Sequence, residues 1–266
     1  MKKNLLILSF LLIAVSALAQ KQFVVKSPDG VLQVHITINK AIEYEIIHGN
    51  DVMLAKSPVA MLLGNGKSFG IDPKLSGSAI RKVDQFIDAP IYKRLQIRDN
   101  CNELTLKFKG DYELIFRAYN DGIAYRFETS MDQPFVVAEE KAVFNFPADL
   151  TAYIPYVKKE RVSLEEQFYN SFENVYAHIK LSEWDAGRLA FSPLVVESVN
   201  GKKICLAEAD LLNYPGMYLH NSDHSNTLVG VFAPYPKQIQ QGGYNMLQGE
   251  VKSRESYIAK FDGATK

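Results

Sequence analysis

Short runs of alternating apolar and polar residues extend along the chain from Phe23 onward. The clearest run places four aliphatic residues at every second position: Leu32, Val34, Ile36 and Ile38. A period of two indicates strands with one buried face, and turn sequences such as Ser27-Pro28-Asp29-Gly30 separate the runs. Little of the chain shows sustained helical periodicity. The pattern therefore predicts an all-β, mainly antiparallel β-sandwich or barrel.

Further strands are expected at the other apolar runs: 23–25, 44–47, 52–54, 61–63, 95–97, 104–108, 135–137, 144–146, 189–196, 204–208, 217–219 and 227–232. Asp99-Asn100 predicts a break between two of them. Residues 164–179 have poor helical register and are interpreted as a long excursion between sheets. Residues 242–266 lose the alternation and are expected to form a connection whose continuation is missing, or a frayed terminus.

Residues 112–127, YELIFRAYNDGIAYRF, have the pattern of a β-hairpin, because alternating runs flank Asn120-Asp121-Gly122. A two-residue loop of Asp121 and Gly122 would place Arg117 opposite Arg126. Like charges directly opposite one another destabilise a strand pair unless an anion lies between them. A three-residue loop would shift the register and remove this clash.

Residues 1–19 are typical of a secretory signal peptide, with Lys2 and Lys3 before an apolar run and Ala17-Leu18-Ala19 at the expected cleavage site. The apolar run is shorter than the roughly 20 residues of a membrane span. No cysteine follows the cleavage site to support a lipoprotein anchor. We therefore expect residues 20–266 to form the mature protein, in the periplasm or outside the cell.

Charge and cysteine content narrow the possible partners. The chain of 266 residues has a formal charge of 0, which becomes −2 when the two lysines of the leader are removed. This balance argues against nucleic acid and against an anionic membrane surface as partners.

Cys101 and Cys205 could pair in an oxidising compartment or remain free, buried thiols. The length of the mature chain is consistent with a single β domain.

No self-contained catalytic motif is present in the sequence: it lacks a nucleophile elbow, a P-loop, a dinucleotide fingerprint and a cysteine-rich zinc pattern. His220 and His224 are spaced as metal ligands on a helix would be, but their neighbours predict a turn. The most suggestive segment is 164–173, in which Glu165, Glu166 and Glu173 are interleaved with aromatic residues. Carboxylates beside aromatic rings suit sugars and calcium, although an ordinary solvated loop has the same composition. Four other aromatic residues could stack on sugars or pack in the core: Tyr153, Tyr156, Trp184 and Tyr214.

Four segments, in order along the chain, resemble the N-terminal domain of glycoside hydrolase family 97, a family of bacterial α-glucosidases and α-galactosidases. The turn at residues 27–30 resembles the opening turn of that domain, and the hairpin at 116–127, FRAYNDGIAYRF, resembles its signature hairpin. The loop at 166–170, EQFYN, resembles its E-x-x-Y-polar loop, and the segment at 208–217, EADLLNYPGM, is similar to its E-A-x-L-x-x-Y-x-x-M segment. Together the four matches cover nearly the whole mature chain.

The resemblance implies a large β-sandwich of the galactose-mutarotase type (a supersandwich), which in complete members precedes a catalytic (β/α)₈ barrel. Such a barrel needs roughly 250 residues, and this chain would be truncated before it. The N-terminal domain of complete members lends one glutamate to a calcium ion at the active site. The resemblance assigns that role to Glu166, with Glu165 as the alternative if the alignment shifts by one residue.

On this interpretation the other calcium ligands and the paired catalytic carboxylates lie in the barrel, so that the chain alone is expected to be inactive. We therefore expect the N-terminal, carbohydrate-binding domain of a secreted α-glycoside hydrolase. Its expected partners are an α-linked oligosaccharide and a barrel in the same chain or a separate one. Two alternatives stay open: a stand-alone carbohydrate-binding module and, with less support from the histidines, a mutarotase-like enzyme.

Overall fold

Every strand pairing in the described part of the chain is antiparallel. The structure is a computed structural model and describes residues 20–157, 163–168, 170, 174–243 and 249–265. Within these residues the only helices are three single 3₁₀ turns, and no helix has the length and apolar character needed to cross a membrane. The all-β, antiparallel fold class predicted from the alternation is confirmed.

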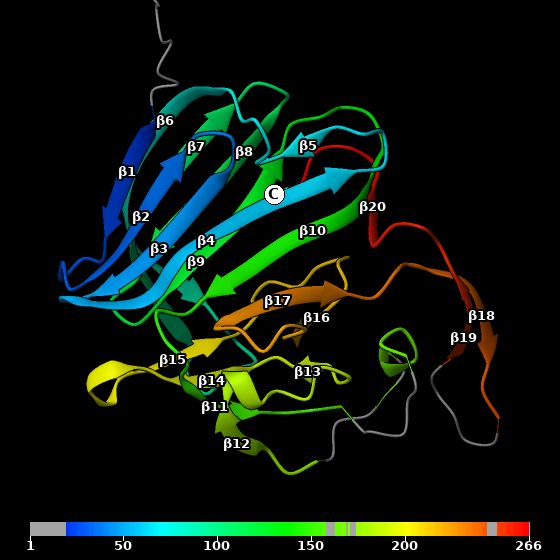
Figure 1. Ribbon diagram of the computed structural model, residues 1–266. Helices are drawn as coiled ribbons and strands as arrows, with labels where there is room; N and C mark the ends of the chain where they lie inside the picture. Colours follow the sequence, from blue (N-terminus) through cyan, green and yellow to red (C-terminus); the bar gives the residue numbers. More distant parts are fainter. Residues whose placement is uncertain (1–19, 158–162, 169, 171–173, 244–248, 266) are drawn as a thin grey trace, which may run out of the picture.

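The strands fall into four sheets (Figure 1). Their bounds are β1 Lys21–Lys26, β2 Leu32–Ile38, β3 Ile42–His48, β4 Asp51–Leu63, β5 Ser68–Phe69, β6 Leu75–Asp88, β7 Gln96–Phe108, β8 Tyr112–Ala118, β9 Ile123–Thr129, β10 Phe135–Asn145, β11 Thr151–Ile154, β12 Ala177–Lys180, β13 Ala190–Phe191, β14 Leu194–Glu197, β15 Lys203–Leu206, β16 Met217–His220, β17 Thr227–Phe232, β18 Pro236–Gln241, β19 Gly249–Arg254 and β20 Ala259–Phe261. The 3₁₀ turns are η1 Glu166–Phe168, η2 Leu181–Glu183 and η3 Val199–Gly201.

The largest sheet has the order β1-β2-β3-β4-β10-β17-β16-β13, with β5 beside β4 and β20 beside β10. A second sheet, β6-β7-β8-β9, packs behind its first four strands (Figure 1). The remaining sheets are β12-β11-β14-β15 and the hairpin β18-β19. The chain thus forms a sandwich of two main sheets with smaller sheets along one end.

The core between the two main sheets is aliphatic with an aromatic seam. Ile36 and Leu54 on one side, and Leu104 and Phe116 on the other, are almost completely buried. The Tyr44 ring lies 5.9 Å from the ring of Phe116, which joins β3 to β8 across the sandwich. Residues at every second position therefore face this core, as the alternation requires.

The hairpin of β8 and β9 forms, and its register is neither that of an Asp121-Gly122 loop nor that of a three-residue loop. Arg117 lies opposite Ala124 and Arg126 lies opposite Ile115, so the two guanidinium groups are not paired. The Tyr119 N–H donates to the Gly122 carbonyl at 2.8 Å, which makes Asn120 and Asp121 the loop residues. The position of the loop, one residue earlier than Asp121-Gly122, removes the predicted clash.

Two other expectations are corrected in the same sheet and at the C-terminal end. β7 continues through Asp99-Asn100 without a break, and β6, which the sequence pattern did not indicate, pairs with it over its whole length. Residues 242–266 do not form only a connection, because their described part contains β19 and β20. Residues 189–196 form two strands of different sheets, β13 and β14. Residues 1–19, assigned to a signal peptide, lie outside the described residues.

Candidate functional site

The loop that contains Glu165 and Glu166 begins with a capping box. The Glu166 Oε2 atom accepts hydrogen bonds from the Ser163 N–H at 2.9 Å and from the Ser163 hydroxyl at 3.0 Å. In return, the Glu166 N–H donates to the Ser163 Oγ atom at 3.2 Å. This reciprocal pattern fixes the first turn of η1. It holds the Glu166 carboxylate at one position on the surface.

Gln167 anchors the same loop to the body of the protein. Its side chain is 1% exposed, although glutamine is seldom so deeply buried. The side-chain carbonyl accepts from the Leu189 N–H at 2.9 Å, and the amide donates to the Gly187 carbonyl at 2.8 Å. These bonds satisfy a buried amide and tie η1 to the chain that precedes β13.

Phe168 packs edge-on against Tyr218 of β16, with 5.3 Å between the ring centroids. Asn170 follows in the loop, and its Nδ2 atom is buried without a hydrogen-bond partner. A buried amide without a partner costs about 1–3 kcal/mol. The described part of the loop thus combines a turn held by several hydrogen bonds with one unsatisfied donor.

Glu165 and Glu166 are both exposed and adjacent to one another. Among the described residues, no group of three or more metal-ligating side chains comes together. The donor chemistry of a carboxylate suits calcium, but calcium takes six to eight oxygen ligands. These two residues could therefore supply only some of the ligands of a calcium site, and the other ligands would have to come from elsewhere. Glu173, the third carboxylate of the segment, lies outside the described residues.

The segment at 208–217 is a loop that Glu208 closes at its base. One carboxylate oxygen of Glu208 accepts from the Met217 N–H at 2.9 Å, and the other accepts from the Ser192 hydroxyl at 3.2 Å. At the middle of the loop, the Tyr214 hydroxyl donates to the Glu140 carboxylate at 2.7 Å. These contacts explain why a glutamate and a tyrosine stand at these positions of the segment.

Glu140 of β10 lies close to Tyr125 of β9 and to the loop at 208–217. Burial raises the pKa of Glu140 to about 7, the nearby Glu208 carboxylate acts in the same direction, and the Tyr214 hydrogen bond opposes both. Half-buried carboxyl groups with such pKa values can accept or release a proton near neutral pH. Glu140 was not identified from the sequence, because no local pattern marks a carboxylate whose neighbours come from distant strands.

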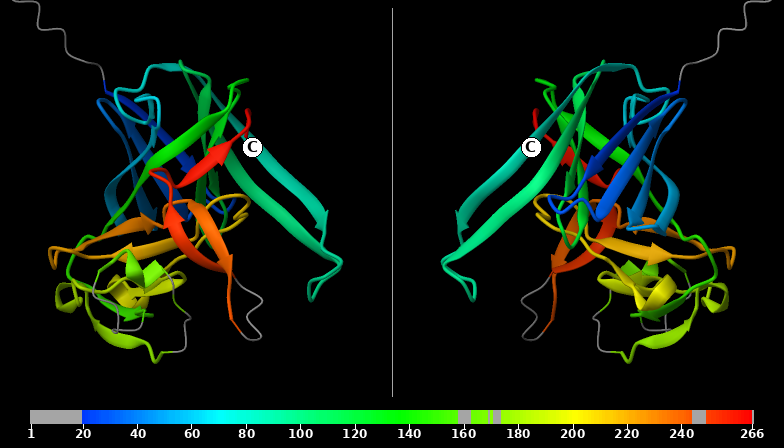
Figure 2. Two further views of the ribbon diagram at one scale, coloured as in Figure 1. Left: turned by 90° about the vertical axis from the view of Figure 1, so that its right-hand side faces the viewer. Right: turned by 90° about the vertical axis from the view of Figure 1, so that its left-hand side faces the viewer.

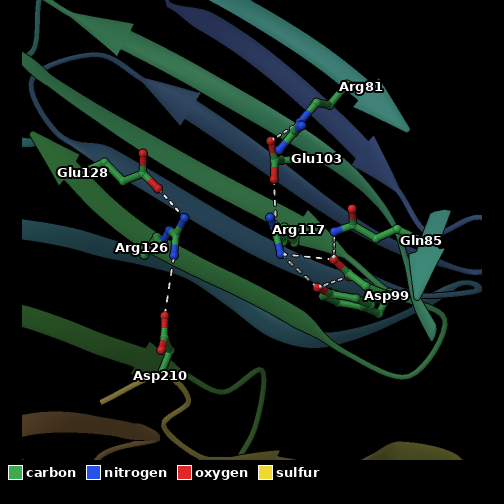
Figure 3. Close-up of polar contacts among 9 residues, drawn as sticks. Arg81, Gln85, Asp99, Glu103, Arg117, Arg126, Glu128 and Asp210 are labelled. Carbon is green, nitrogen blue, oxygen red and sulfur yellow. Dashed lines mark hydrogen bonds and ion pairs between the residues drawn. The ribbon is translucent and has the colours of Figure 1, made fainter. Parts of the chain in front are cut away.

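The outer face of the β6-β9 sheet carries a network of charged side chains (Figure 3). Glu103 of β7 accepts from the Arg117 Nε atom at 2.7 Å and from the Arg81 Nε atom at 2.6 Å. Beside it, Asp99 accepts from the Tyr119 hydroxyl at 2.9 Å and from the Gln85 amide at 3.0 Å. Asp99 and Asn100 can thus stand inside a strand, because side chains from neighbouring strands satisfy the Asp99 carboxylate.

Burial alone would raise the pKa of Glu103, but the hydrogen bonds from Arg81 and Arg117 outweigh it and hold the pKa below its usual range. Arg126 on the same face is more exposed and pairs with Glu128 of its own strand. Its other contact is Asp210, at 3.7 Å, in the loop at 208–217. The arginines and carboxylates of this network neutralise one another, so little unpaired charge is left to bind a ligand.

The remaining candidates from the sequence have structural contacts. His220 lies 2.8 Å from the Ala186 carbonyl, and His224 lies 3.1 Å from the Ser182 carbonyl, so the two rings serve different backbone groups. Trp184 is buried against Tyr156, while Tyr153 stacks on His178 at 4.2 Å between ring centroids. Cys101 is buried and Cys205 exposed, and both thiols are free.

Most of the chain, including the loops at 163–170 and 208–217, matches a known protein family. The model described as glycosyl-hydrolase 97 N-terminal matches residues 25–252, which include both loops and the hairpin of β8 and β9. The chain belongs to this family. The resemblance drawn from the four segments is therefore confirmed.

Relatives with described activities are longer than this chain. A retaining alpha-galactosidase of Bacteroides thetaiotaomicron is 47% identical over 263 residues, which are 98% of this chain and 40% of that protein. A probable retaining alpha-galactosidase of Streptomyces bingchenggensis is 26% identical over 145 residues, 53% of this chain and 22% of that protein. The chain thus spans about two fifths, or less, of the relatives that it matches.

Solved structures share the fold. A Glycoside Hydrolase Family 97 enzyme from Pseudoalteromonas sp. strain K8, in complex with acarbose, superposes with a TM-score of 0.70 at 19% identity, covering 91% of this chain and 34% of that one. A beta-arabinopyranosidase superposes with a TM-score of 0.71 at 22% identity, covering 91% of this chain and 38% of that one. At identities of 19% and 22%, these superpositions show that the chain shares the fold of the two enzymes.

Proposed function

We propose that this chain is the N-terminal, carbohydrate-facing domain of a secreted, calcium-dependent α-glycoside hydrolase and acts together with a catalytic barrel. The observation that carries the proposal is the 47% identity to a retaining alpha-galactosidase over 98% of this chain. The activity of that relative favours an α-galactoside as the substrate. The fold we propose is the galactose-mutarotase-like supersandwich, and the location is the periplasm or the exterior.

In this proposal Glu166 donates one carboxylate oxygen to a calcium ion, and Glu165 is the alternative ligand. The capping box with Ser163 supports Glu166, because it fixes that carboxylate before any ion arrives. The unpaired Asn170 amide supports an approach to this loop by an acceptor from another part of the enzyme or from the sugar. A bound calcium ion would supply positive charge that orients and polarises sugar oxygens.

A chimera tests the proposal. This chain replaces the matching part of the Bacteroides thetaiotaomicron enzyme, and hydrolysis of an α-galactoside is measured as a function of calcium concentration. We expect an active chimera in which Glu166→Gln raises the calcium concentration for half-maximal activity about tenfold, a loss of about 1.4 kcal/mol in binding. A folded chimera without activity would contradict the proposed partnership with a barrel.

Glu183→Gln is the matched control, because Glu183 also stands at a 3₁₀ turn and its carboxylate accepts from the backbone N–H three residues earlier, that of Lys180, at 3.0 Å. Glu183→Gln should leave the calcium dependence unchanged. If Glu165→Gln shifts the dependence and Glu166→Gln does not, the ligand is Glu165. If neither shifts it, neither glutamate is a calcium ligand.

Calorimetric titration of the chain with melibiose, with and without calcium, tests the role of the barrel. Because one carboxylate cannot hold calcium, we expect no heat from the isolated chain, and heat from binding and hydrolysis of the sugar by the chimera. Sugar binding by the isolated chain would instead favour a carbohydrate-binding module that works alone.

A further inference from the structure

The distal half of the β6-β7 hairpin, residues 80–97, forms an arm that projects from the body of the protein (Figure 2). It carries many of the large apolar side chains that are exposed in the described structure: Ile80, Phe86, Ile87, Ile91, Tyr92, Leu95 and Ile97. Exposed apolar side chains gathered on one element mark an interaction surface. The arm is therefore expected to contact another molecule.

One edge of the arm has unpaired backbone groups. β6 ends the order of its sheet, and no strand of the described residues pairs with its outer side. The Ala89 N–H donates to the Leu95 carbonyl, so the odd-numbered residues of β6 direct their backbone groups to β7. The even-numbered residues, Ile80 to Asp88, present their N–H and C=O groups to the free edge. Such an edge can pair with a further strand.

The sequence of this edge is complementary to itself. In antiparallel pairing of two copies, even-numbered residues must lie opposite even-numbered residues. One such register sets Lys82 opposite Asp84 of the second copy, and Ile80 opposite Phe86 of the second copy. The two neighbouring registers set Lys82 against Lys82, or Asp84 against Asp84, and like charges directly opposite are unfavourable.

Contacts within the chain favour this register. Asp84 already accepts from Arg98 at 2.7 and 2.8 Å, so a lysine from the second copy would extend an existing ion pair. Ile80 is 62% exposed and Phe86 is 66% exposed, and each would gain an apolar partner. A hollow of about 300 Å³ lies between β1 and β6, with Val24 and Ile80 in its lining. The Phe86 ring of the second copy would lie beside it.

We propose that two copies of this chain associate through the β6 edges, antiparallel about a twofold axis, with Lys82 of each copy opposite Asp84 of the other. The interface is isologous, because the same surface serves both copies. Four apolar side chains flank the central charges, two Ile80 and two Phe86. The backbone hydrogen bonds continue each β6-β7-β8-β9 sheet into the second copy.

Charge reversal with sedimentation analysis of residues 20–266 tests this dimer. We expect a dimer at micromolar concentration, and an increase of about tenfold or more in its dissociation constant for Lys82→Glu alone and for Asp84→Lys alone. An equimolar mixture of the two variants should form a heterodimer. In that heterodimer the two introduced side chains, which have opposite charges, face each other, and the unchanged Lys82 of one copy faces the unchanged Asp84 of the other. Recovery in the mixture excludes misfolding as the cause of the loss.

Lys67→Glu is the matched control, since Lys67 lies exposed in the turn before β5 and has no place in the proposed interface. It should dimerise like the unchanged chain. A monomer at all concentrations would overturn the proposal and leave the arm to a different partner. A dimer that neither reversal weakens, or a mixture that stays monomeric, would also overturn it.

Discussion

The polar clusters around Glu103 and Glu140 each hold a carboxyl group that is shielded from water, fully at Glu103 and partly at Glu140, yet the pKa values of the two groups shift in opposite directions. The Glu103 side chain is 4% exposed and meets two arginines, which hold its pKa below the usual range. Glu140 meets a tyrosine hydroxyl and another carboxylate, and its pKa rises to about 7. Burial is common to both sites, and the partners decide which form of the carboxyl group the fold prefers.

The two shifts have opposite consequences for stability. A lowered pKa in the folded state means that Glu103 contributes stability above the pKa of the unfolded chain, and loses it as the pH falls through the folded pKa. A raised pKa means that Glu140 contributes stability below the unfolded pKa, and loses it as the pH rises towards 7. The Glu103 site therefore loses its stabilising effect as the pH falls into the acid range, and the Glu140 site loses it as the pH rises from about 4.5 to about 7.

The largest effect is expected from removing an arginine beside Glu103. Arg117→Met leaves a buried carboxylate with only the more exposed Arg81 as partner. Breaking a buried ion pair typically costs about 3 kcal/mol. We expect that decrease in the free energy of unfolding at pH 7, measured by urea denaturation, and a smaller decrease at pH values where Glu103 is protonated.

Arg126→Met makes the same substitution on the same sheet face, at a side chain that is 46% exposed. Exposed pairs are worth less than about 1 kcal/mol. If both variants lost the same free energy of unfolding, the arginine partners of the buried Glu103 would contribute no more stability than an exposed ion pair does. The contrast between Glu103 and Glu140 would then not depend on those partners.

A smaller effect, of opposite sign, is expected for Glu140→Gln. Glutamine resembles the protonated carboxyl group, so the variant should match the unchanged chain below the ordinary pKa of 4.5. From that value to about 7, the unchanged chain loses stability that the variant keeps. Allowing for the water that still reaches this side chain, we expect the variant to be more stable by about 2 kcal/mol above pH 7. A difference that does not vary with pH would show that the Glu140 pKa is not raised.

Most strands could be predicted from the sequence because one face of each is buried. The alternation of Leu32 to Ile38 corresponds directly to β2. β6 could not be predicted, since most of it is exposed on both faces and its sequence, LSGSAIRKVDQFID, has no regular alternation. The loop of the β8-β9 hairpin was misplaced by one residue, because Asp-Gly is a frequent loop pair and the local sequence did not reveal that Gly122 pairs with Tyr119.

The candidate site was only partly predictable for a similar reason. The capping box of Ser163 and Glu166 follows a local S-x-x-E pattern that the sequence displays. Glu140, by contrast, meets Tyr214 across 74 positions of the chain. Strand register brings such groups together, and no pattern over neighbouring residues records it.

The smallest effect is expected from removing Tyr214, the partner whose hydrogen bond favours the charged form of Glu140. Tyr214→Phe deletes the hydroxyl that donates to this carboxylate. We expect a loss of about 1 kcal/mol, larger above pH 7 than below it, because the bond is stronger to the ionised group. The Glu140 pKa should rise further, which carbon-detected nuclear magnetic resonance of the carboxyl group measures directly. Tyr235→Phe, a substitution at a ring that packs against Tyr257, should leave this pKa unchanged. A lower Glu140 pKa in Tyr214→Phe would instead mean that the hydroxyl stabilises the protonated form and is itself one cause of the raised pKa.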